Sequence, residues 1–339
     1  MQGESGKKAS ATTQQETQAR QAQATAAKQR RLQDDQDAKD AQGGGRGQPE
    51  GASQQDRQRP EPPMPAQHLD KPGSEAEMAL APQYLAPSYR GSGKLEGLAA
   101  IITGGDSGIG RAVAVLYARE GADVAVVYLN EHEDAEETAR RVRAEGRRCL
   151  LIPGDVKDAQ FCRDAAAQAH KEFGRIDVLV NNAAFQEHAQ TLMDITEERW
   201  DETLRTNIYG YFHMTRAVLP YLKRGAAIVN SGSVTGLKGS GQLLDYSATK
   251  GAIHAFTMSL ASNLVKQGIR VNAVAPGPVW TPLNPADRSA KDIQQFGSQT
   301  DMGRPAQPEE LSPAYVFLAS QACSSYITGI VLPVTGSVG

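Results

Sequence analysis

A tyrosine and a lysine four residues apart, Tyr246 and Lys250, are the side chains of this sequence best suited to acid–base chemistry. Four residues span about one helical turn, so both side chains are expected on one face of a helix. A nearby ammonium group favours the phenolate and lowers the tyrosine pKa from about 10, which makes the phenol a usable proton donor and acceptor. Ser233 lies 13 residues upstream, and its hydroxyl could hold the oxygen of a substrate. Such tyrosine–lysine pairs are common on helix surfaces, so this interpretation needs support from the rest of the chain.

A glycine-rich segment indicates a site for a phosphate group. Residues 103–110 read Thr-Gly-Gly-Asp-Ser-Gly-Ile-Gly and directly follow the apolar run 99–102. Between a strand and a helix, such glycines permit a tight turn and let the backbone approach a pyrophosphate, which the helix N-terminus stabilises. The spacing differs from the Gly-x-Gly-x-x-Gly of the dinucleotide fingerprint, so a glycine turn without a ligand stays an alternative. The residues assigned to this loop are Thr103, Gly104, Asp106, Ser107, Gly108, Ile109 and Gly110.

The choice between NAD and NADP is expected to depend on the end of the second strand. Enzymes that use NAD commonly place an acid there, which binds the ribose 2′-hydroxyl. Here the segment 127–130 reads Val-Tyr-Leu-Asn, and the first acid is Glu131. The missing carboxylate favours NADP over NAD, although no arginine or lysine is present for a 2′-phosphate, and Tyr128 is assigned to the cofactor site. Beyond the third strand, Asp155 and Val156 are assigned to the adenine, whose amine Asp155 could bind; a helix N-cap is an equally good interpretation of Asp155.

Several motifs follow one another in the order seen in a known family. From about Gly93 to its end, the chain resembles a short-chain dehydrogenase/reductase of the non-extended type. Segment 103–110 resembles the family's Thr-Gly-x-x-x-Gly-x-Gly, and 181–184, Asn-Asn-Ala-Ala, resembles its Asn-Asn-Ala-Gly. The further matches are Asn207, Ser233, Tyr246, Lys250, Pro276, Gly277 and Thr281. Within the family, the glycine loop and the segments 244–246 and 276–281 resemble the bacterial glucose/ribitol dehydrogenase-like general stress oxidoreductases.

This resemblance implies an enzyme that moves a hydride between a nicotinamide cofactor and an alcohol or carbonyl compound. Tyr246 would exchange the proton with the substrate oxygen, and Ser233 would bind that oxygen. Lys250 would lower the Tyr246 pKa and hold the nicotinamide ribose, while Asn207 would fix a water that links Lys250 to solvent. The cofactor contacts implied beyond the glycine loop are Asn182, Ala183, Tyr246, Lys250, Pro276, Gly277, Val279 and Thr281. The chain departs from the family pattern at Ala184, Gly232 and Ser337, and none of these changes removes a catalytic group.

Two alternative functions remain. An enoyl reductase of the same fold uses a wider tyrosine–lysine spacing, so the spacing of four argues against it. A non-catalytic nucleotide-binding scaffold would keep the glycine loop but would not need Ser233, Tyr246 and Lys250 together. The loop 278–304 is expected to cover the site, and its polar composition suits a polyol, a sugar or a small aldehyde.

The elements that must position these residues alternate regularly. Short apolar runs predict strands, and amphipathic segments between them predict helices, the pattern of a parallel sheet covered on both faces. The predicted strands are 99–102, 124–127, 150–152, 178–180, 227–229, 270–275 and 330–334. The predicted fold is therefore α/β, a doubly wound, Rossmann-like parallel sheet of about seven strands in one domain over residues 96–339.

The N-terminal quarter of the chain has a different composition. Between Met1 and Pro63 the only large aliphatic side chain apart from the initiating methionine is Leu32, so residues 1–60 are predicted to be a disordered low-complexity tail. A solvated helix over 12–42 is compatible with the composition, but we see no apolar stripe with which it could dock. Residues 61–95 are rich in proline and predict an extended arm, either a linker or a segment that lies on the domain or on a neighbouring subunit.

The overall composition limits the partners. A formal net charge of −3 gives no indication of nucleic-acid binding, and no apolar run is long enough to span a membrane. Cys149, Cys162 and Cys323 have no metal or redox spacing, and the histidines have no ligand spacing, so no metal site is expected. We expect a cytoplasmic protein with a small-molecule substrate, and the resemblance implies a homo-oligomer, a tetramer or a dimer.

Overall fold

A parallel sheet with the strand order β3-β2-β1-β4-β5-β6-β7 is the centre of the computed structural model, which describes residues 3–40 and 59–336. The strands are β1 (Ala99–Thr103), β2 (Asp123–Tyr128), β3 (Cys149–Pro153), β4 (Val178–Asn181), β5 (Ala227–Ser231), β6 (Arg270–Pro276) and β7 (Val331–Val334). β1, β2, β4, β5 and β6 are buried along their whole length, which is why they appear in the sequence as continuous apolar runs. The predicted α/β fold with a seven-stranded parallel sheet is confirmed.

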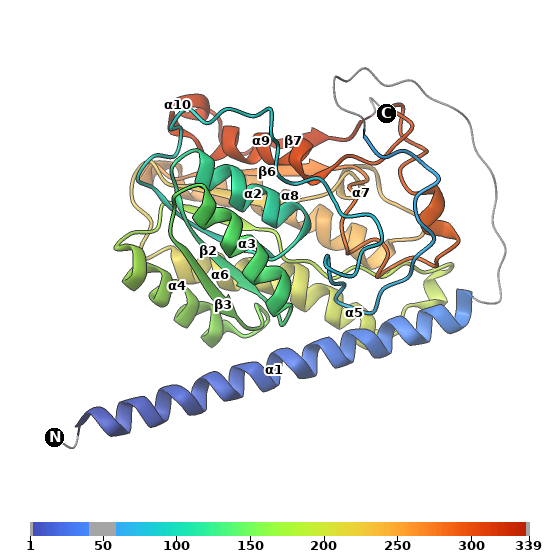
Figure 1. Ribbon diagram of the computed structural model, residues 1–339, viewed down its shortest axis with the longest axis horizontal. Helices are drawn as coiled ribbons and strands as arrows, with labels where there is room; N and C mark the ends of the chain where they lie inside the picture. Colours follow the sequence, from blue (N-terminus) through green and yellow to red (C-terminus); the bar gives the residue numbers. More distant parts are fainter. Residues whose placement is uncertain (1–2, 41–58, 337–339) are drawn as a thin grey trace.

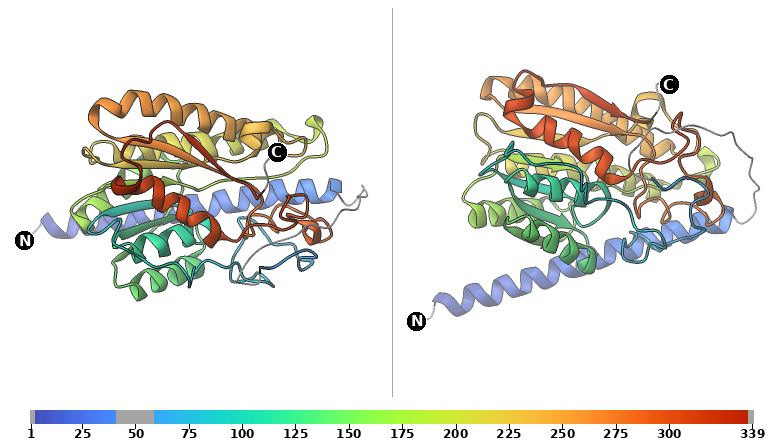
Figure 2. Two further views of the ribbon diagram at one scale, coloured as in Figure 1. Left: turned by 90° about the horizontal axis from the view of Figure 1, so that it is seen from above. Right: turned by 45° about the horizontal axis from the view of Figure 1, so that its top comes forward.

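Helices cover both faces of this sheet (Figure 2). One apolar layer contains residues of α2, α3 and α9, and the other contains residues of α4, α6 and α8. The helices are α2 (Gly108–Arg119), α3 (His132–Ala144), α4 (Ala159–Phe173), α5 (Glu197–Leu204), α6 (Gly210–Val218), α7 (Thr235–Lys238), α8 (Leu244–Leu264), α9 (Pro308–Ala319) and α10 (Gln321–Ser324). Single turns of other helix types are η1 (Leu192–Asp194), η2 (Arg205–Tyr209), η3 (Val265–Gln267) and η4 (Asp292–Gln295).

The direction of winding reverses between β1 and β4. From β1 the chain proceeds outward to β2 and β3, and it then returns to β4 on the other side of β1. In such sheets a ligand binds beyond the carboxyl ends of the strands at this switch point, because the loops on either side turn away from each other. The glycine loop after β1 and the segment after β4 therefore meet at one place.

The proline-rich arm lies on the domain. Met64, Leu69 and Met78 are buried against Trp280, Ile293 and Phe296 in a third apolar cluster. The indole nitrogen of Trp280 also donates a hydrogen bond to the Leu80 carbonyl oxygen at 2.8 Å. Of the two interpretations that the sequence left open, the structure therefore supports a docked arm rather than a linker.

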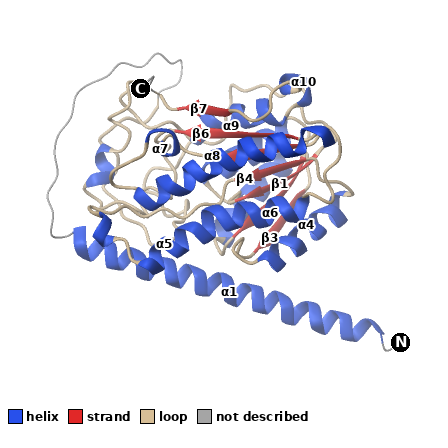
Figure 3. Cartoon of the chain, turned by 180° about the vertical axis from the view of Figure 1, so that it is seen from behind, coloured by secondary structure: helices blue, strands red, loops and turns tan. Residues whose placement is uncertain are grey.

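The helix α1 (Gly3–Asp40) differs from the expected disordered tail (Figure 1). It runs along one side of the domain beside α5, and Figure 3 shows the same arrangement from behind. Its buried side chains are Ala22, Ala26, Gln29, Leu32, Gln33 and Gln36, and apart from Leu32 they recur at spacings of four and three. The prediction of disorder is thus corrected for Gly3–Asp40, because small alanines and hydrogen-bonding glutamines form the docking face that an apolar stripe would otherwise form. The predictions for residues 1–2 and 41–58, and for Ser337, lie outside the described residues.

None of the described helices combines the length and apolar character required to cross a membrane.

Candidate active site

Two adjoining cavities open at the carboxyl edge of the sheet. The first, called the nucleotide cavity, is lined by the glycine loop and by the ends of β2 and β3. The second, called the substrate cavity, is lined by Ser233, Tyr246 and Lys250. The residues that line both cavities are Ile109, Asn182, Ala184, Thr281 and Leu283. The glycine loop and the candidates Ser233, Tyr246 and Lys250 therefore face two neighbouring cavities that share part of their lining.

The glycine loop has the close backbone packing that a pyrophosphate site requires. Gly108 begins α2 with a φ of +50°, and a β-carbon there would lie 2.9 Å from Cγ2 of Thr281. A β-carbon on Gly110 would lie 1.9 Å from the Gly104 carbonyl oxygen, so only glycine lets the helix start this near the loop. Ser107, at the N-cap of α2, makes no capping hydrogen bond with its side chain. The closely packed glycine backbone at the start of α2 thus fits a dinucleotide phosphate.

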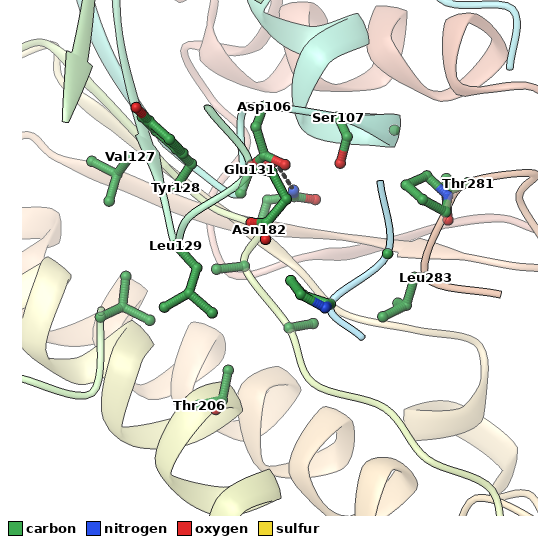
Figure 4. A pocket seen from close by; sticks show the side chains of 18 of the residues that line it. Asp106, Ser107, Val127, Tyr128, Leu129, Glu131, Asn182, Thr206, Thr281 and Leu283 are labelled. Atoms are coloured by element: carbon green, nitrogen blue, oxygen red, sulfur yellow. Dashed lines mark hydrogen bonds between the residues drawn. The ribbon is translucent and has the colours of Figure 1, made fainter. Parts of the chain in front are cut away.

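The far end of the nucleotide cavity is lined by residues assigned to the adenosine (Figure 4). Tyr128, Leu129 and Asp155 lie at the ends of β2 and β3, and Asp106 and Glu131 also line this cavity. Burial, helped by the neighbouring Asp106 carboxylate, raises the pKa of Glu131 to about 8. Burial also raises the pKa of Asp106 to about 6. The acid that the sequence places just beyond β2 therefore turns into the cavity and holds a proton near neutral pH.

The catalytic candidates converge from two elements. Tyr246 and Lys250 lie one turn apart in α8, and Ser233 follows β5. The Lys250 ammonium lies 5.2 Å from the centroid of the Tyr246 ring and donates a hydrogen bond to the Ser231 carbonyl oxygen at 2.8 Å. The Ser233 hydroxyl accepts hydrogen bonds from the Thr235 amide and hydroxyl at 3.1 and 3.0 Å. All three catalytic candidates are buried and line the substrate cavity, and Tyr246 and Lys250 share one face of α8, as their spacing predicts.

The pKa values differ from the sequence-based expectation. Burial raises the pKa of Tyr246, the carboxylate of Asp287 raises it further, and the hydrogen bond from Ser233 acts in the opposite direction. Burial also lowers the pKa of Lys250 to about 7. The expected lowering of the Tyr246 pKa by Lys250 is therefore wrong for this structure, because desolvation outweighs the attraction to a lysine that is itself only partly charged near neutral pH.

Asn207 lies in the π-helical turn η2 and does not line either cavity. Its side-chain oxygen accepts from the Phe185 amide at 2.8 Å, and its side-chain nitrogen donates to the Phe185 carbonyl and to the Thr249 hydroxyl. In this structure Asn207 therefore connects the segment after β4 to α8, where its partner Thr249 directly precedes Lys250. Its predicted role in holding a water stays a prediction.

Most of the predicted cofactor residues line the two cavities. Those in the nucleotide cavity are Gly104, Asp106, Ser107, Gly108, Ile109, Tyr128, Asp155, Val156, Asn182, Ala183 and Thr281. Those in the substrate cavity are Tyr246, Lys250, Pro276, Gly277 and Val279. Thr103 and Gly110 line neither; the Thr103 hydroxyl accepts hydrogen bonds from the Asn182 and Ala183 amides at 2.9 and 3.1 Å, which fixes β1 to the end of β4.

Sequence reasoning missed the arm as a part of this site. Pro72 and Gly73 line the nucleotide cavity, and a β-carbon on Gly73 would lie 2.8 Å from the Pro282 carbonyl oxygen. Glu75 accepts from the Gly108 amide and from Arg111, both at 2.6 Å. The arm thus holds the first turn of α2. The sequence did not predict this contact, because a single Glu or Lys in a segment without apolar periodicity does not indicate that its side chain is buried.

A buried cluster of charges lies behind the substrate cavity. Glu187, His188 and Asp287 bring ligand-type atoms within 4.8 Å of one another, which is a spacing that a metal ion could use. The Lys71 ammonium of the arm already lies 3.1 Å from the Glu187 carboxylate and donates to the Gln186 and Ala286 carbonyl oxygens at 2.8 Å. We therefore interpret this cluster as an ion-pair network that supports the site.

Gly232, one of the departures from the family pattern, makes room for a histidine. A β-carbon at this position would lie 2.2 Å from Nε2 of His254. The same nitrogen accepts a long hydrogen bond from the Ser233 amide at 3.4 Å. The glycine thus allows His254 to pack against the backbone of Ser233.

Comparison with known proteins identifies the family. Residues 104–337 match the family model described as "Enoyl-(Acyl carrier protein) reductase". "General stress protein 39" of Bacillus subtilis is 53% identical over 274 residues, which are 80% of this chain and 96% of that protein. "NADPH-dependent aldehyde reductase 1, chloroplastic" of Arabidopsis thaliana is 47% identical over 272 residues, 78% of this chain and 94% of that protein. The chain belongs to the short-chain dehydrogenase/reductase family, as its motifs predicted.

A solved structure supports the same assignment. The short-chain dehydrogenase of Burkholderia cenocepacia J2315, crystallised in complex with NADP, is 32% identical and matches with a TM-score of 0.67 over 72% of this chain and 98% of its own. The chain is accordingly an oxidoreductase of the kind that uses a nicotinamide cofactor. The description of the matching family model names an enoyl reductase, but the tyrosine–lysine spacing of four argues against that reaction here.

Proposed function

We propose that this protein interconverts an alcohol and its carbonyl compound with NAD(P) as the hydride carrier and with Tyr246 as the acid/base. The observation that carries the proposal is that Ser233, Tyr246 and Lys250 line a cavity that adjoins the nucleotide cavity and shares part of its lining. A bound reduced cofactor would supply the hydride to the carbonyl carbon. The protein supplies the orientation of the reactants and the proton.

The residues of the chain have separate roles in this reaction. The Ser233 hydroxyl donates a hydrogen bond to the substrate oxygen, and the Tyr246 phenol gives that oxygen its proton as the alcohol forms. The Tyr246 pKa is raised by burial, so the phenol is protonated and ready to donate. Lys250, close beneath the ring, stabilises the phenolate that remains, and Thr281 lies where the two cavities meet.

Both NAD and NADP are compatible with the family, and NADP is the proposed preference. Supporting observations are the acid-free end of β2 and the NADPH-dependent relative. The protonated Glu131 also leaves room for a 2′-phosphate, because a neutral carboxyl does not repel it. Glu131 therefore makes the preference depend on pH.

The ratio of kcat/KM with NADPH to kcat/KM with NADH is expected to fall as pH rises through about 8. The pKa of Glu131 is about 8, so the carboxyl is neutral below that pH and becomes an anion that repels the 2′-phosphate above it. Initial rates with both cofactors from pH 7 to 9 measure the ratio. Glu131→Gln, at the N-cap of α3, should make the ratio nearly constant over this range. Glu133→Gln, at an exposed position in the first turn of α3, should leave the pH dependence of the ratio as it is in the unchanged protein. A constant ratio in the unchanged protein would contradict the role of Glu131.

The substrate is proposed to be an aldehyde or ketone with several polar groups, such as a sugar or polyol derivative. The side chains that line the substrate cavity beyond the catalytic residues include Gln186, Thr235, Ser240, Asn284 and Arg288. Purified protein should oxidise NADPH or NADH with members of a panel of aldehydes, sugars and polyol-derived ketones, including carboxylated and phosphorylated aldehydes that Arg288 could bind. Binding of dinucleotide without turnover of any panel member would favour the non-catalytic scaffold instead. The predicted homo-oligomer stays a prediction.

A further inference from the structure

The helix α1 covers the adenosine end of the nucleotide cavity. Thr25 and Gln29 of α1 line this cavity together with Tyr128 and Asp155. The Thr25 hydroxyl donates a hydrogen bond to Asp155, the carboxylate that the sequence assigns to the adenine amine. A segment more than a hundred residues away in the sequence thus reaches the group expected to bind the base.

Polar contacts hold α1 in this position. The buried Gln33 amide donates to the carbonyl oxygens of Leu69 and Ala286 at 2.7 and 2.8 Å, and its oxygen accepts from the Lys71 amide at 2.8 Å. One side chain therefore joins α1 to the arm and to the loop that covers the substrate cavity. A buried amide with all of these bonds is costly to displace, because undocking α1 breaks them together.

Charges at the same end fix the register of α1 on α5. Glu202 of α5 is fully buried, and it accepts from the Gln29 amide at 3.1 Å. The ammonium groups of Lys28 and Lys157 lie 3.1 and 2.7 Å from its two oxygens. These lysines keep the pKa of Glu202 below its usual range although burial opposes this. Thr25 and Gln29 are thereby held at the rim of the cavity.

We propose that α1 is a permanent part of the cofactor site, in which Thr25 and Gln29 contact the adenosine of the bound dinucleotide and slow its release. The proposal rests on the dinucleotide binding of the proposed function. A hydroxyl both donates and accepts, so Thr25 can keep its bond to Asp155 and accept one from the adenine amine. By covering this end, α1 also excludes water from the hydrogen bonds between the base and Asp155, and it strengthens them.

Undocking α1 in the full-length protein tests the proposal. Ala22 and Ala26 are buried on the docking face, whereas Ala24 and Ala27 are exposed on the same helix. Ala22→Glu with Ala26→Glu should raise the Kd for NADPH and NADH about tenfold or more and increase the dissociation rate. The control variant, Ala24→Glu with Ala27→Glu, adds the same charge and should leave the Kd and the dissociation rate within about twofold of the values for the unchanged protein. Fluorescence titration gives the Kd, and stopped-flow displacement gives the dissociation rate, without any substrate.

Single side chains provide a second test. Thr25→Val and Gln29→Met should each raise the Kd about two- to tenfold, the effect of losing one hydrogen bond, while Gln23→Met on the exposed face should not. Equal Kd values for the buried-face and exposed-face double variants would overturn the proposal, and a lower Kd after undocking would show instead that α1 competes with the adenine. If the unchanged protein bound neither dinucleotide, the proposed function would be wrong, and this inference with it.

Discussion

Replacing Tyr246 with phenylalanine is expected to lower kcat by about 10² or more. The change removes one oxygen atom and with it the proton donor, and loss of general acid catalysis commonly costs a factor of this size. The ring stays, so its packing in α8 and its contact with Lys250 are preserved. Steady-state kinetics with the best substrate of the panel measure kcat, and fluorescence titration with NADPH should give an unchanged Kd.

A matched variant separates chemistry from a general effect of the substitution. Tyr326 is fully exposed and far in sequence from the site, so Tyr326→Phe should leave kcat unchanged. If Tyr246→Phe kept more than a tenth of the original kcat, Tyr246 would not be the proton donor. A large fall in melting temperature would instead indicate a structural role.

The fold could be predicted because its strands are buried on both faces. β1 is buried along its whole length and begins with four apolar residues in a row, 99–102. Such a run can be recognised in the sequence without knowing which strands lie beside it. The positions of the catalytic candidates and of the glycine loop beside the cavities were also predictable, because each expected chemical role demands one residue type at one spacing. Ser233, Tyr246 and Lys250 then converge because the ends of parallel strands meet at one edge of the sheet.

The arm and α1 could not be predicted with the same rules. Their contacts with the cofactor site are made by single polar side chains, such as Glu75 with the Gly108 amide and Gln33 with the Ala286 carbonyl oxygen. A single hydrogen bond produces no periodic pattern in a sequence. The spacing of Ala22, Ala26, Gln29, Gln33 and Gln36 was the available signal. It was overlooked because glutamine and alanine are usual in solvated helices, so the stripe did not differ in polarity from the exposed face.

The pKa values were missed for a different reason. A spacing of four between Tyr246 and Lys250 indicates proximity but gives no measure of burial. Once both groups are buried, desolvation favours their neutral forms and opposes the mutual attraction that proximity alone suggests. The direction of the shift therefore depends on the whole fold.

The second large effect is expected from the arm. Replacing Lys71 with methionine should lower the free energy of unfolding by about 3–5 kcal/mol, the usual cost of removing one partner of a buried ion pair. The Lys71 side chain is buried, and its ammonium lies 3.1 Å from the fully buried Glu187 carboxylate. Methionine has a similar length and flexibility, so the loss comes from the charge and the hydrogen bonds rather than from a cavity. Calorimetry or chemical unfolding measures the loss. In the control Lys171→Met, which replaces an exposed lysine, the free energy of unfolding should change by less than about 0.5 kcal/mol.

The pH dependence of this loss identifies its cause. The folded-state pKa of Glu187 is about 7, above its ordinary value, because burial outweighs the attraction of Lys71. Without Lys71 this pKa rises further, so the folded variant holds a proton that the unfolded chain has already released. The stability deficit of Lys71→Met should therefore widen as pH increases above about 7, and adding Glu187→Gln should remove that widening and recover part of the loss. A deficit below about 1 kcal/mol at pH 8, or one that does not change with pH, would mean that Lys71 does not hold the arm against the site through Glu187.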